Sequence, residues 1–345
     1  MKGGQLNFAL VGAGVIAPSH IHAIEQCSRA RLVAIYDQDR DRAGRRVAES
    51  KSREARVVST FEEVLEDGAV DVVDVIVPSG LHERFAVPAA QAGKHLLVEK
   101  PLEITLPAVD RIIEAVNKAG VKLAVSFQRR FMPGFCAARE AVRSGALGPM
   151  VFGNAYLKAF RSRAYYRSAA WRGTWALDGG GALMNQGIHG VDALLWTMGP
   201  VARVFARADH LARDIEVEDT AMAVLEYESG AFGVIEAATS ANPGMPIKLE
   251  FAGEKGTAVA DEKGLSFFAV EKEFDTLAED DPARHVRNPE KAWHDLVVQD
   301  LVDAIEKDMA PRCGGEEGRR SVELILAIYE SARTGRDVAL SRSAS

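Results

Sequence analysis

The sequence predicts an α/β fold: a doubly wound parallel sheet at the N-terminus, followed by an α+β domain with a large open, mostly antiparallel sheet. Three observations support this prediction. The 345 residues exceed the size that one hydrophobic core usually supports, so two domains are expected. Short apolar runs alternate with helical patterns over the first 125 residues, whereas longer β-rich runs follow one another after that point. A glycine-rich turn also follows the first apolar run.

Residues 1–125 make up the predicted first domain. Its apolar runs are rich in valine, leucine and alanine, which is typical of strands buried on both faces of a parallel sheet. Strands are expected at 6–11, 31–36, 72–77, 95–98 and 122–125, and helices at 18–27, 39–50, 60–66, 82–92 and 106–119. Because each strand leads through a helix to the next strand, we expect right-handed crossovers and a parallel sheet.

Residues 126–345 form the predicted second domain. Strands are expected at 150–160, 202–208, 220–227, 231–238 and 247–252, and helices at 133–144, 185–198, 289–307 and 318–334. The sequence Glu228-Ser229-Gly230 between two β-rich runs predicts a hairpin. Strands that follow one another in this way favour a mostly antiparallel sheet, with the helices packed against one face.

Composition excludes several classes of function. The net charge of −7 and the lack of a basic face argue against nucleic-acid binding. The apolar run near the N-terminus is six residues long, which is too short for a signal peptide or a membrane span. Cys27, Cys136 and Cys313 lie far apart without the spacing of metal ligands, so we expect reduced thiols and no metal site. A cytoplasmic location is the simplest interpretation.

The segment 10–17 has the pattern of a dinucleotide-binding turn between a strand and a helix. Gly12 permits the tight turn, and Gly14 lets backbone amides approach a pyrophosphate. The start of the helix supplies partial positive charge, so Val15 and Ile16 are also expected at the cofactor. The alternative is an ordinary strand–helix loop, which glycines also punctuate.

An acidic residue strengthens the prediction of a cofactor site. Asp37 ends the second strand, 23 positions after Gly14, where a carboxylate accepts hydrogen bonds from both ribose hydroxyls of adenosine. The same charge repels a 2′-phosphate, so NAD is favoured over NADP as the cofactor. Arg40 and Arg42 lie close by in the sequence, and they leave NADP open as the less favoured alternative.

Lys100 lies where a catalytic group is expected. It follows the apolar run 95–98 and precedes Pro101, which places it at the carboxyl end of a parallel strand, where ligands bind in such sheets. A lysine there can exchange a proton with a substrate hydroxyl. The alternative is a solvated surface charge with Glu99 as its ion-pair partner.

These motifs occur together in a familiar order. Gly12-Ala13-Gly14, Asp37, Glu99-Lys100-Pro101 and the segment 179–192 resemble the glucose-fructose oxidoreductase, inositol dehydrogenase and MocA (Gfo/Idh/MocA) family, over nearly the whole chain. The resemblance implies an N-terminal Rossmann domain and NAD-dependent oxidation or reduction of a sugar or cyclitol hydroxyl. It also implies a homodimer or homotetramer built on the sheet face of the second domain. The motifs look closer to sugar or sugar-nucleotide dehydrogenases than to inositol dehydrogenases.

The resemblance assigns two proton-handling residues. Lys100 corresponds to the catalytic lysine of the family, and His189 to its active-site histidine. Many polyol dehydrogenases of the family have an aspartate four residues before that histidine, whereas this chain has Asn185. An amide can bind a substrate hydroxyl but cannot act as a base, so Lys100 and His189 remain the candidates for proton transfer. Asp192 either orients His189 or is a helix cap or surface carboxylate.

Further cofactor contacts follow from the same resemblance. Pro78 and Ser79 come after the third major strand, where members of the family contact the diphosphate and the adjoining ribose; His82 nearby is equally plausible as a first-turn helix residue. Gln128 corresponds to a residue near the nicotinamide or the substrate, and Trp171-Arg172 to a pair that reaches into the cofactor pocket. The expected cofactor-binding residues are Gly12, Gly14, Val15, Ile16, Asp37, Pro78, Ser79, His82, Glu99, Lys100, Gln128, Trp171 and Arg172.

The segment 161–172 is expected to be a loop that contacts the substrate. It is rich in arginine and tyrosine; aromatic rings stack on sugars, and guanidinium groups bind carboxylates or phosphates. We therefore expect a pyranose with an anionic substituent, such as a uronate or a nucleotide diphosphate. Salt bridges between domains or subunits are the alternative. The expected substrate-binding residues are Gln128, Arg163, Tyr166, Arg172 and Asn185.

The sequence thus predicts an NAD-dependent dehydrogenase that acts on a secondary hydroxyl, or the matching ketone, of a sugar, a sugar derivative or a cyclitol. Two alternatives remain open. One is an NAD-dependent glycosidase that works by transient oxidation and elimination, with the cofactor regenerated in each turnover. The other is a non-catalytic NAD-binding regulatory protein, which the intact Lys100 and His189 disfavour.

Overall fold

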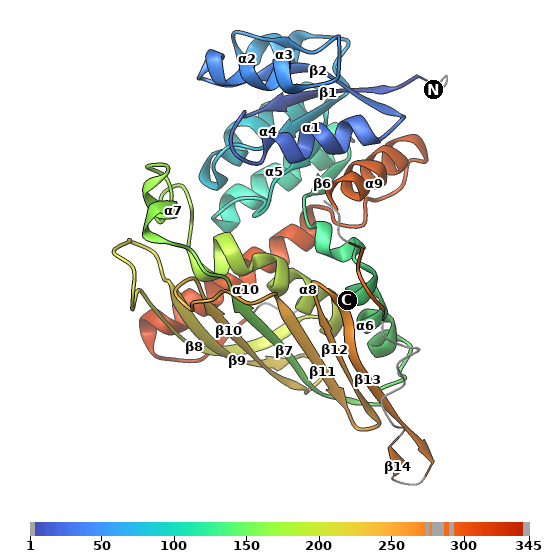
Figure 1. Ribbon diagram of the computed structural model, residues 1–345, viewed down its shortest axis with the longest axis vertical. Coiled ribbons are helices and arrows are strands. Elements are labelled where there is room, and N and C mark those ends of the chain that lie inside the picture. Colours follow the sequence, from blue (N-terminus) through green and yellow to red (C-terminus); the bar gives the residue numbers. More distant parts are fainter. Residues whose placement is uncertain (1–3, 274–275, 278–285, 290–292, 341–345) are drawn as a thin grey trace. The chain divides into compact units, whose positions relative to one another are not determined.

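The chain folds into two compact units in a computed structural model, which describes residues 4–273, 276–277, 286–289 and 293–340 (Figure 1). The first unit comprises residues 1–128 and 291–319, and the second comprises 129–290 and 320–345. The division into domains at residue 126 remains a prediction. One element groups differently from that division, because helix α9 (His294–Glu306) belongs to the first unit although it follows the strands of the second.

A six-stranded sheet in the order β3-β2-β1-β4-β5-β6 forms the centre of the first unit. All of its pairs are parallel, so the predicted doubly wound sheet is confirmed. Its strands are β1 (Leu6–Val11), β2 (Ala30–Tyr36), β3 (Arg56–Val57), β4 (Val72–Val75), β5 (His95–Val98) and β6 (Leu123–Val125). Its helices are α1 (Ala17–Gln26), α2 (Arg40–Glu49), α3 (Phe61–Glu66), α4 (His82–Gln91), α5 (Leu106–Ala119) and α9, which packs against α1.

The core of the first unit is built from strands that are buried on both faces. Phe8 of β1 and Val72, Val73 and Val75 of β4 are fully buried. Parallel strands that helices cover on both sides lose almost all contact with water, which explains the continuous apolar runs in the sequence. Asp74 is equally buried in the middle of β4, so its carboxyl group requires a hydrogen-bonding or charged partner inside the protein.

A nine-stranded sheet in the order β14-β13-β12-β11-β7-β10-β9-β8-β15 forms the second unit. Of the pairs that the structure describes in this sheet, β7–β10 is parallel and the others are antiparallel. The strands are β7 (Met150–Lys158), β8 (Val201–Asp209), β9 (Thr220–Tyr227), β10 (Phe232–Ala238), β11 (Lys248–Gly253), β12 (Gly256–Asp261), β13 (Gly264–Glu273), β14 (Thr276–Leu277) and β15 (Val338–Ala339). The helices are α6 (Pro133–Arg143), α7 (Arg163–Arg167), α8 (Ile188–Met198) and most of α10 (Gly315–Thr334).

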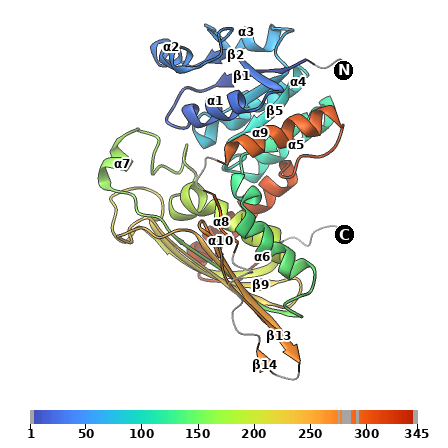
Figure 2. The same ribbon diagram turned by 45° about the vertical axis from the view of Figure 1, so that its right-hand side comes forward.

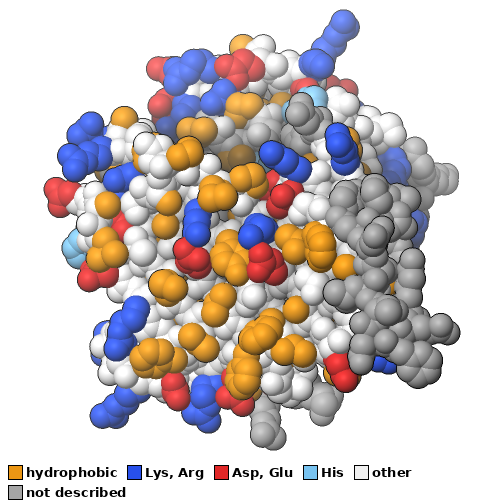
Figure 3. Space-filling model, turned by 60° about the horizontal axis from the view of Figure 1, so that its bottom comes forward, with side chains coloured by type: hydrophobic (Ala, Val, Ile, Leu, Met, Phe, Trp, Pro, Cys, Tyr) orange, Lys and Arg blue, Asp and Glu red, His pale blue; other side chains and the backbone are white. Residues whose placement is uncertain are grey.

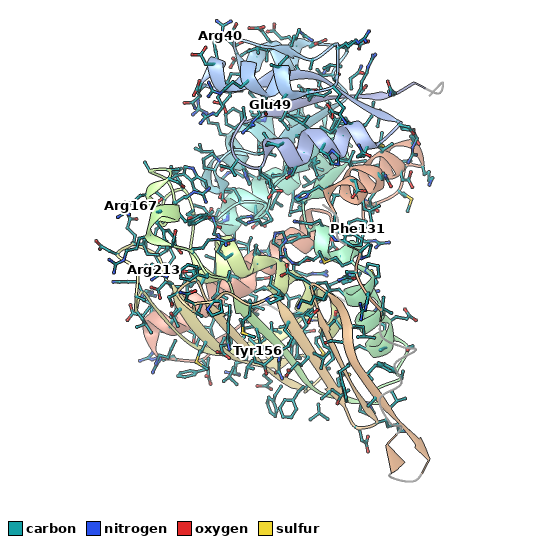
Figure 4. The ribbon with its side chains drawn as sticks, viewed as in Figure 1. Arg40, Glu49, Phe131, Tyr156, Arg167 and Arg213 are labelled. Atoms are coloured by element: carbon teal, nitrogen blue, oxygen red, sulfur yellow. The ribbon has the colours of Figure 1, made fainter. Side chains whose placement is uncertain are left out.

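One face of the nine-stranded sheet is packed on helices and the other is open (Figure 2). Helices α6 and α8 contact the sheet on the packed face. Side chains along β8 and β9 alternate between buried and exposed, as expected for a sheet with one covered face. The open face carries exposed apolar side chains, among them Phe152, Met222, Val224 and Phe232 (Figure 3). Tyr156 of β7 shares this face, because side chains alternate along a strand and Tyr156 lies four residues after Phe152 (Figure 4).

Three of the differences between the structure and the predicted elements concern the second unit. The segment 161–172, predicted as a loop, contains α7, which begins where the Ser162 hydroxyl accepts a hydrogen bond from the N–H of Tyr165. Strands β12 and β13 extend the sheet through ladders to β11 and to each other, and such pairing cannot be read from one short run. The helix expected at 185–198 begins as a π-helix, Ala182–Gly187, before α8.

The helix predicted at 289–307 includes residues 290–292, which lie outside the described residues, and α9 begins at His294. Among the described helices, none combines the length and the hydropathy that crossing a membrane requires.

Candidate active site

The glycine turn after β1 has the geometry that a dinucleotide site requires. Gly12 has a φ of +108°, and a Cβ atom there would lie 2.9 Å from the carbonyl oxygen of Ile76, so only glycine fits. At Gly14 no atom lies within 4 Å of the place where a Cβ would be, and Val15 next to it is 82% exposed. Helix α1 then begins without a side-chain cap. The N–H groups of Ala17 and Ser19 already bond the carbonyl oxygens of Gly14 and Ile16, at 3.2 and 3.0 Å, so an anion would approach the turn that precedes the helix.

Asp37 lies beside this turn, at the end of β2. One oxygen of its carboxylate accepts the N–H of Ala13 at 2.7 Å, and the other accepts the N–H of Asp39 at 2.8 Å and the guanidinium of Arg42 at 2.7 Å. Arg42 belongs to α2, whose first and last residues, Arg40 and Glu49, are labelled in Figure 4. The carboxylate is only 8% exposed, and its position directly beside the turn suits an adenosine ribose.

Two segments that follow neighbouring strands are joined by His82. One ring nitrogen lies 2.8 Å from the carbonyl oxygen of Pro101, and the other lies 3.0 Å from that of Val77. Burial lowers the pKa of His82, since the charged imidazole is disfavoured away from water. These contacts favour a role in holding the ends of β4 and β5 together. Ser79, which lies between Val77 and His82 in the sequence, is also buried.

Lys100 follows directly on β5, at the carboxyl end of the strand. The Oε2 atom of Glu99 accepts the backbone N–H of Lys100 at 3.1 Å, and the peptide bond between Lys100 and Pro101 is cis. The side chain of Lys100 is half-buried. In the sheet β1, β4 and β5 are neighbours, so the turn at Gly12, the segment at Ser79 and Lys100 all follow the carboxyl ends of adjacent strands.

A buried network behind Glu99 was not anticipated from the sequence. The Nδ1 atom of His20 in α1 lies 2.8 Å from Asp74, and its Nε2 atom lies 2.9 Å from Oε1 of Glu99. His294 of α9 adds a second imidazole, whose Nε2 atom lies 4.0 Å from the same oxygen. The ligand atoms of His20, Glu99 and His294 all lie within 4.8 Å of one another. Asp74, a charge inside an apolar run, was the available signal in the sequence.

The electrostatics of this network favour the charged forms of His20 and Glu99. Burial lowers the pKa of His20, but the charges and hydrogen bonds of Asp74 and Glu99 outweigh burial and raise it from 6.5 to about 10. Burial raises the pKa of Glu99, but the hydrogen bond and charge of His20, with the charges of Lys100 and His294, lower it from 4.5 to about 2. Burial raises the pKa of Asp74, against the charge of His20.

In the second unit, Asn185 and His189 lie at the junction of the π-helix with α8. His189 is 8% exposed and stands in the first turn of α8. The side-chain amide of Asn185 donates a hydrogen bond to Asp178, and the amide of Gln186 donates one to the carbonyl oxygen of Asn185. Asp178 is 1% exposed and also accepts the N–H of Gly173 at 2.8 Å. A carboxylate therefore adjoins the position where this chain has asparagine, and sequence reasoning missed it.

Asp192 is buried and forms an ion pair. Its carboxylate accepts two hydrogen bonds from the guanidinium of Arg130, at 2.9 and 2.7 Å. It is fully buried, so the interpretation of Asp192 as a surface carboxylate is wrong. A buried bidentate pair of this kind holds the start of α8 to the segment before α6.

The glycines at 179–181 make room for protein side chains. A Cβ atom at Gly180 would lie 2.0 Å from the hydroxyl oxygen of Tyr329. That hydroxyl donates a hydrogen bond to Glu218 at 2.8 Å, and Glu218 also accepts the N–H groups of Gly181 and Leu183 at 2.9 and 2.8 Å. Glu218 thus satisfies the donors at the start of the π-helix, a role that the sequence did not reveal.

The arginines and tyrosines of the segment 161–172 stack on one another. The guanidinium of Arg172 lies 4.1 Å from the centre of the Tyr165 ring, and the Tyr165 hydroxyl accepts a hydrogen bond from Gln186 at 2.9 Å. Within the described residues, Nε of Arg172 is buried without a hydrogen-bond partner. Tyr166 is buried, and its hydroxyl donates to Thr239 at 2.8 Å, whereas Arg163 is exposed. Tyr165 therefore links the arginines to Asn185 through Gln186.

Comparison with known proteins covers both units. Residues 6–127 match an oxidoreductase family with an NAD-binding Rossmann fold, and residues 135–259 match the GFO/IDH/MocA C-terminal domain. A myo-inositol 2-dehydrogenase of Thermotoga maritima is 30% identical over 97% of this chain and 98% of its own length. A D-glucoside 3-dehydrogenase of Escherichia coli is 26% identical, with 99% of each chain covered.

The chain is also similar to a solved structure over both units. The WlbA dehydrogenase of Bordetella pertussis, crystallised with NADH and UDP-GlcNAcA, is 33% identical to this chain. The match covers 98% of this chain and 100% of that one, with a TM-score of 0.87.

Proposed function

Since this chain belongs to the Gfo/Idh/MocA family of oxidoreductases, we propose that it transfers a hydride between NAD and a secondary hydroxyl of a sugar, a sugar derivative or a cyclitol. The family membership and the NAD-binding Rossmann fold confirm the predicted family and cofactor, and the chain is an oxidoreductase acting on CH–OH groups. The substrate class and the residues that do the chemistry are the proposal.

The observation that carries the proposal is the convergence of three segments on one edge of a parallel sheet. The glycine turn, the segment at Ser79 and Lys100 follow the carboxyl ends of β1, β4 and β5, which are neighbours. Ligands bind at this edge in open α/β sheets. A cofactor placed over the turn would therefore reach toward the strand end that carries Lys100.

The residues of the first unit fit a dinucleotide. Space at Gly14 and the uncapped start of α1 suit a pyrophosphate, and Asp37 suits the adenosine ribose. When bound, NAD supplies the hydride acceptor. The proposed cofactor-binding set keeps Gly12, Gly14, Val15, Ile16, Asp37, Pro78, Ser79, His82, Glu99, Lys100 and Gln128 of the first unit, with Trp171 and Arg172 of the second.

Lys100 is the proposed acceptor of the hydroxyl proton. As hydride leaves the carbon, the neutral amine would take this proton, and His189 and Asn185 would hold the hydroxyl oxygen. Asp178 supports this role of Asn185, because it fixes the amide through a charge-assisted hydrogen bond. Lys100 and His189 come from different units, so their action on one substrate is part of the proposal.

We propose a sugar with an anionic substituent as the substrate. Arg163 and Arg172 would bind the anion, Tyr166 and its neighbours would line the sugar site, and Gln128 would contact the reacting ring. The buried Nε of Arg172, which has no partner within the described residues, supports an anionic ligand. The related WlbA dehydrogenase was crystallised with UDP-GlcNAcA, a ligand of this kind.

A homodimer or homotetramer built on the open face of the nine-stranded sheet is also proposed. Rows of apolar side chains cross this face: Phe205, Val224 and Val234 pair in register, as do Phe232 and Phe152. Several of them are about half exposed, including Val224 at 54% and Phe232 at 54%. Contiguous exposed apolar side chains of this extent mark interaction surfaces. A cytoplasmic location is proposed as well, and it agrees with three cysteines that form no disulfide.

The test is a screen of sugars, uronates, cyclitols and sugar nucleotides with NAD and NADP, followed by the absorbance of the reduced cofactor. Lys100→Ala should lower turnover by roughly 10²-fold or more while NAD still binds. Lys118→Ala, an exposed lysine on α5, is the matched control and should leave turnover unchanged. Near-normal turnover of Lys100→Ala would refute the assignment. Glycoside cleavage without net NADH formation would identify the NAD-dependent glycosidase instead.

A further inference from the structure

We propose that His20 is a positioning residue for Lys100 and acts on it through the carboxylate of Glu99. The inference rests on the proposed catalytic role of Lys100 and adds a residue that no motif assigned. One oxygen of Glu99 accepts the backbone N–H of Lys100 at 3.1 Å. The other oxygen lies 2.9 Å from Nε2 of His20. His20 is thus linked to the backbone of Lys100 through a single side chain.

The ring of His20 is itself held from the opposite side. Its Nδ1 atom lies 2.8 and 3.1 Å from the two carboxylate oxygens of Asp74, in the middle of β4. His20 and Asp74 are both almost completely buried, at 1% and 0% exposure. An imidazole bonded through both nitrogens cannot turn without breaking a buried hydrogen bond, so the Glu99 carboxylate has a fixed direction.

The same arrangement sets the charge beside Lys100. A carboxylate favours the ammonium form of a neighbouring lysine, whereas a base must be neutral to accept a proton. His20, protonated between two carboxylates, offsets the negative charge of Glu99. The groups that face Glu99 are His20 from α1, His294 from α9 and the adjacent Lys100. The charge of Glu99 also acts on Asp74, on the other side of His20, and on His82.

A metal ion is the other occupant that this cluster can hold. His20, Glu99 and His294 offer three ligand atoms within 4.8 Å of one another. The Nε2 atom of His20 and Oε1 of Glu99 are 2.9 Å apart, which is a hydrogen-bond distance. Two ligands of a tetrahedral zinc ion are separated by roughly 3.3 Å. The distance therefore favours the direct hydrogen bond.

The experiment measures how readily Lys100 is acetylated as a function of pH. The full chain is treated with a limiting amount of acetic anhydride, and mass spectrometry of the peptide that contains Lys100 gives the midpoint of the reaction. In His20→Gln, Asp74 is the more deeply buried of the two carboxylates and should take up a proton, which leaves Glu99 charged beside Lys100. The midpoint should then move to higher pH by roughly one unit.

Two further variants are compared with His20→Gln in the same measurement. His95→Gln removes a half-buried imidazole at the opposite end of β5, where it accepts the N–H of Lys122, and should leave the midpoint unchanged. Glu99→Gln removes the carboxylate charge and should move the midpoint to lower pH. If His20→Gln does not fold, His20→Asn removes the same charge and should move the midpoint to higher pH in the same way.

An unchanged midpoint in His20→Gln, or an equal shift in His95→Gln, would overturn the proposal. A shift of the wild-type midpoint on treatment with EDTA would show a bound metal and would overturn it too. The acetylation measurement needs no substrate, so its result does not depend on whether the proposed dehydrogenase activity is found. Where a substrate is found, His20→Gln should lower kcat and retain the KM for that substrate.

Discussion

The side-chain amide of Asn185 donates a hydrogen bond to the carboxylate of Asp178, in a part of the second unit where Asp178 is 1% exposed. Many polyol dehydrogenases of the family carry the carboxylate at the position of Asn185 itself. In this chain the carboxylate belongs to Asp178, seven residues earlier in the sequence, and it is joined to Asn185 by a hydrogen bond. Asn185 is therefore oriented by a carboxylate, although it does not carry one.

The first prediction concerns this pair. Asp178→Asn should lower kcat/KM for the sugar by roughly 10- to 100-fold, because a hydrogen bond to a charged group contributes about 1.5–3 kcal/mol. NAD affinity should change much less than kcat/KM, because Asp178 is not among the proposed cofactor-binding residues. Steady-state kinetics and NAD titration measure the two effects. Asp209→Asn, at the exposed end of β8, is the control, and an equal loss in both variants would argue against a specific role.

The second prediction concerns cofactor choice. Asp37→Ser removes the carboxylate beside the glycine turn and releases the guanidinium of Arg42, which it holds at 2.7 Å. NAD affinity should fall by about tenfold or more, and the preference should move toward NADP because the repulsion of a 2′-phosphate is lost. Binding of both cofactors is measured by fluorescence titration. Asp41→Ser removes an exposed charge from α2, the helix that contains Arg42, and should change neither affinity. An unaltered cofactor preference in Asp37→Ser would contradict the prediction.

The third prediction concerns stability and pH. The pKa of His20 is raised from 6.5 to about 10, so its contribution to the free energy of unfolding is complete below pH 6.5 and is lost as pH rises toward 10. The pKa of Glu99 is lowered from 4.5 to about 2, so its contribution is complete above pH 4.5 and is lost as pH falls toward 2. The wild type should therefore exceed His20→Gln in stability most clearly between pH 4.5 and 6.5.

Urea unfolding followed by circular dichroism at several pH values between 5 and 10 checks this dependence. The difference between the wild type and His20→Gln should shrink steadily above pH 6.5. Burial lowers the pKa of His95, so His95 is neutral over the upper part of this range and the effect of His95→Gln should stay constant there. A difference for His20→Gln that stays constant above pH 6.5, or that grows as pH rises, would mean that His20 is not held protonated in the folded protein.

The fourth prediction concerns assembly. If the open sheet face joins subunits, Val224→Glu should reduce the mass measured by sedimentation velocity, because it places an unpaired charge within an apolar contact. A symmetric interface repeats each substitution on both subunits, which increases the effect. Leu211→Glu, at an apolar position that is 71% exposed outside the strands, should leave the mass unchanged. A monomeric wild type, or an unaltered assembly in Val224→Glu, would refute this interface.

Much of the first unit could be predicted because its signals are local. The strand expected at 6–11 has the bounds of β1, and the helix expected at 106–119 has those of α5. An apolar run between turn residues specifies a strand wherever it occurs, and a positive φ at Gly12 is a property of one residue. Strands β12 and β13 were missed because their order depends on ladders to partners elsewhere in the sheet.

The sequence by itself determined the alternation of strands and helices, the glycine turn with Asp37, and the place of Lys100 at a strand end, since each depends on periodicity or on neighbours along the chain. Only the tertiary structure decided what supports these residues. His20 contacts Asp74 and Glu99, 54 and 79 residues away, because its side chain reaches from α1 to the middle of β4 and to the residue after β5. Asp178 contacts Asn185 because a turn folds back on the π-helix. Buried polar groups must find partners wherever the packed chain offers them, and that choice is made in three dimensions.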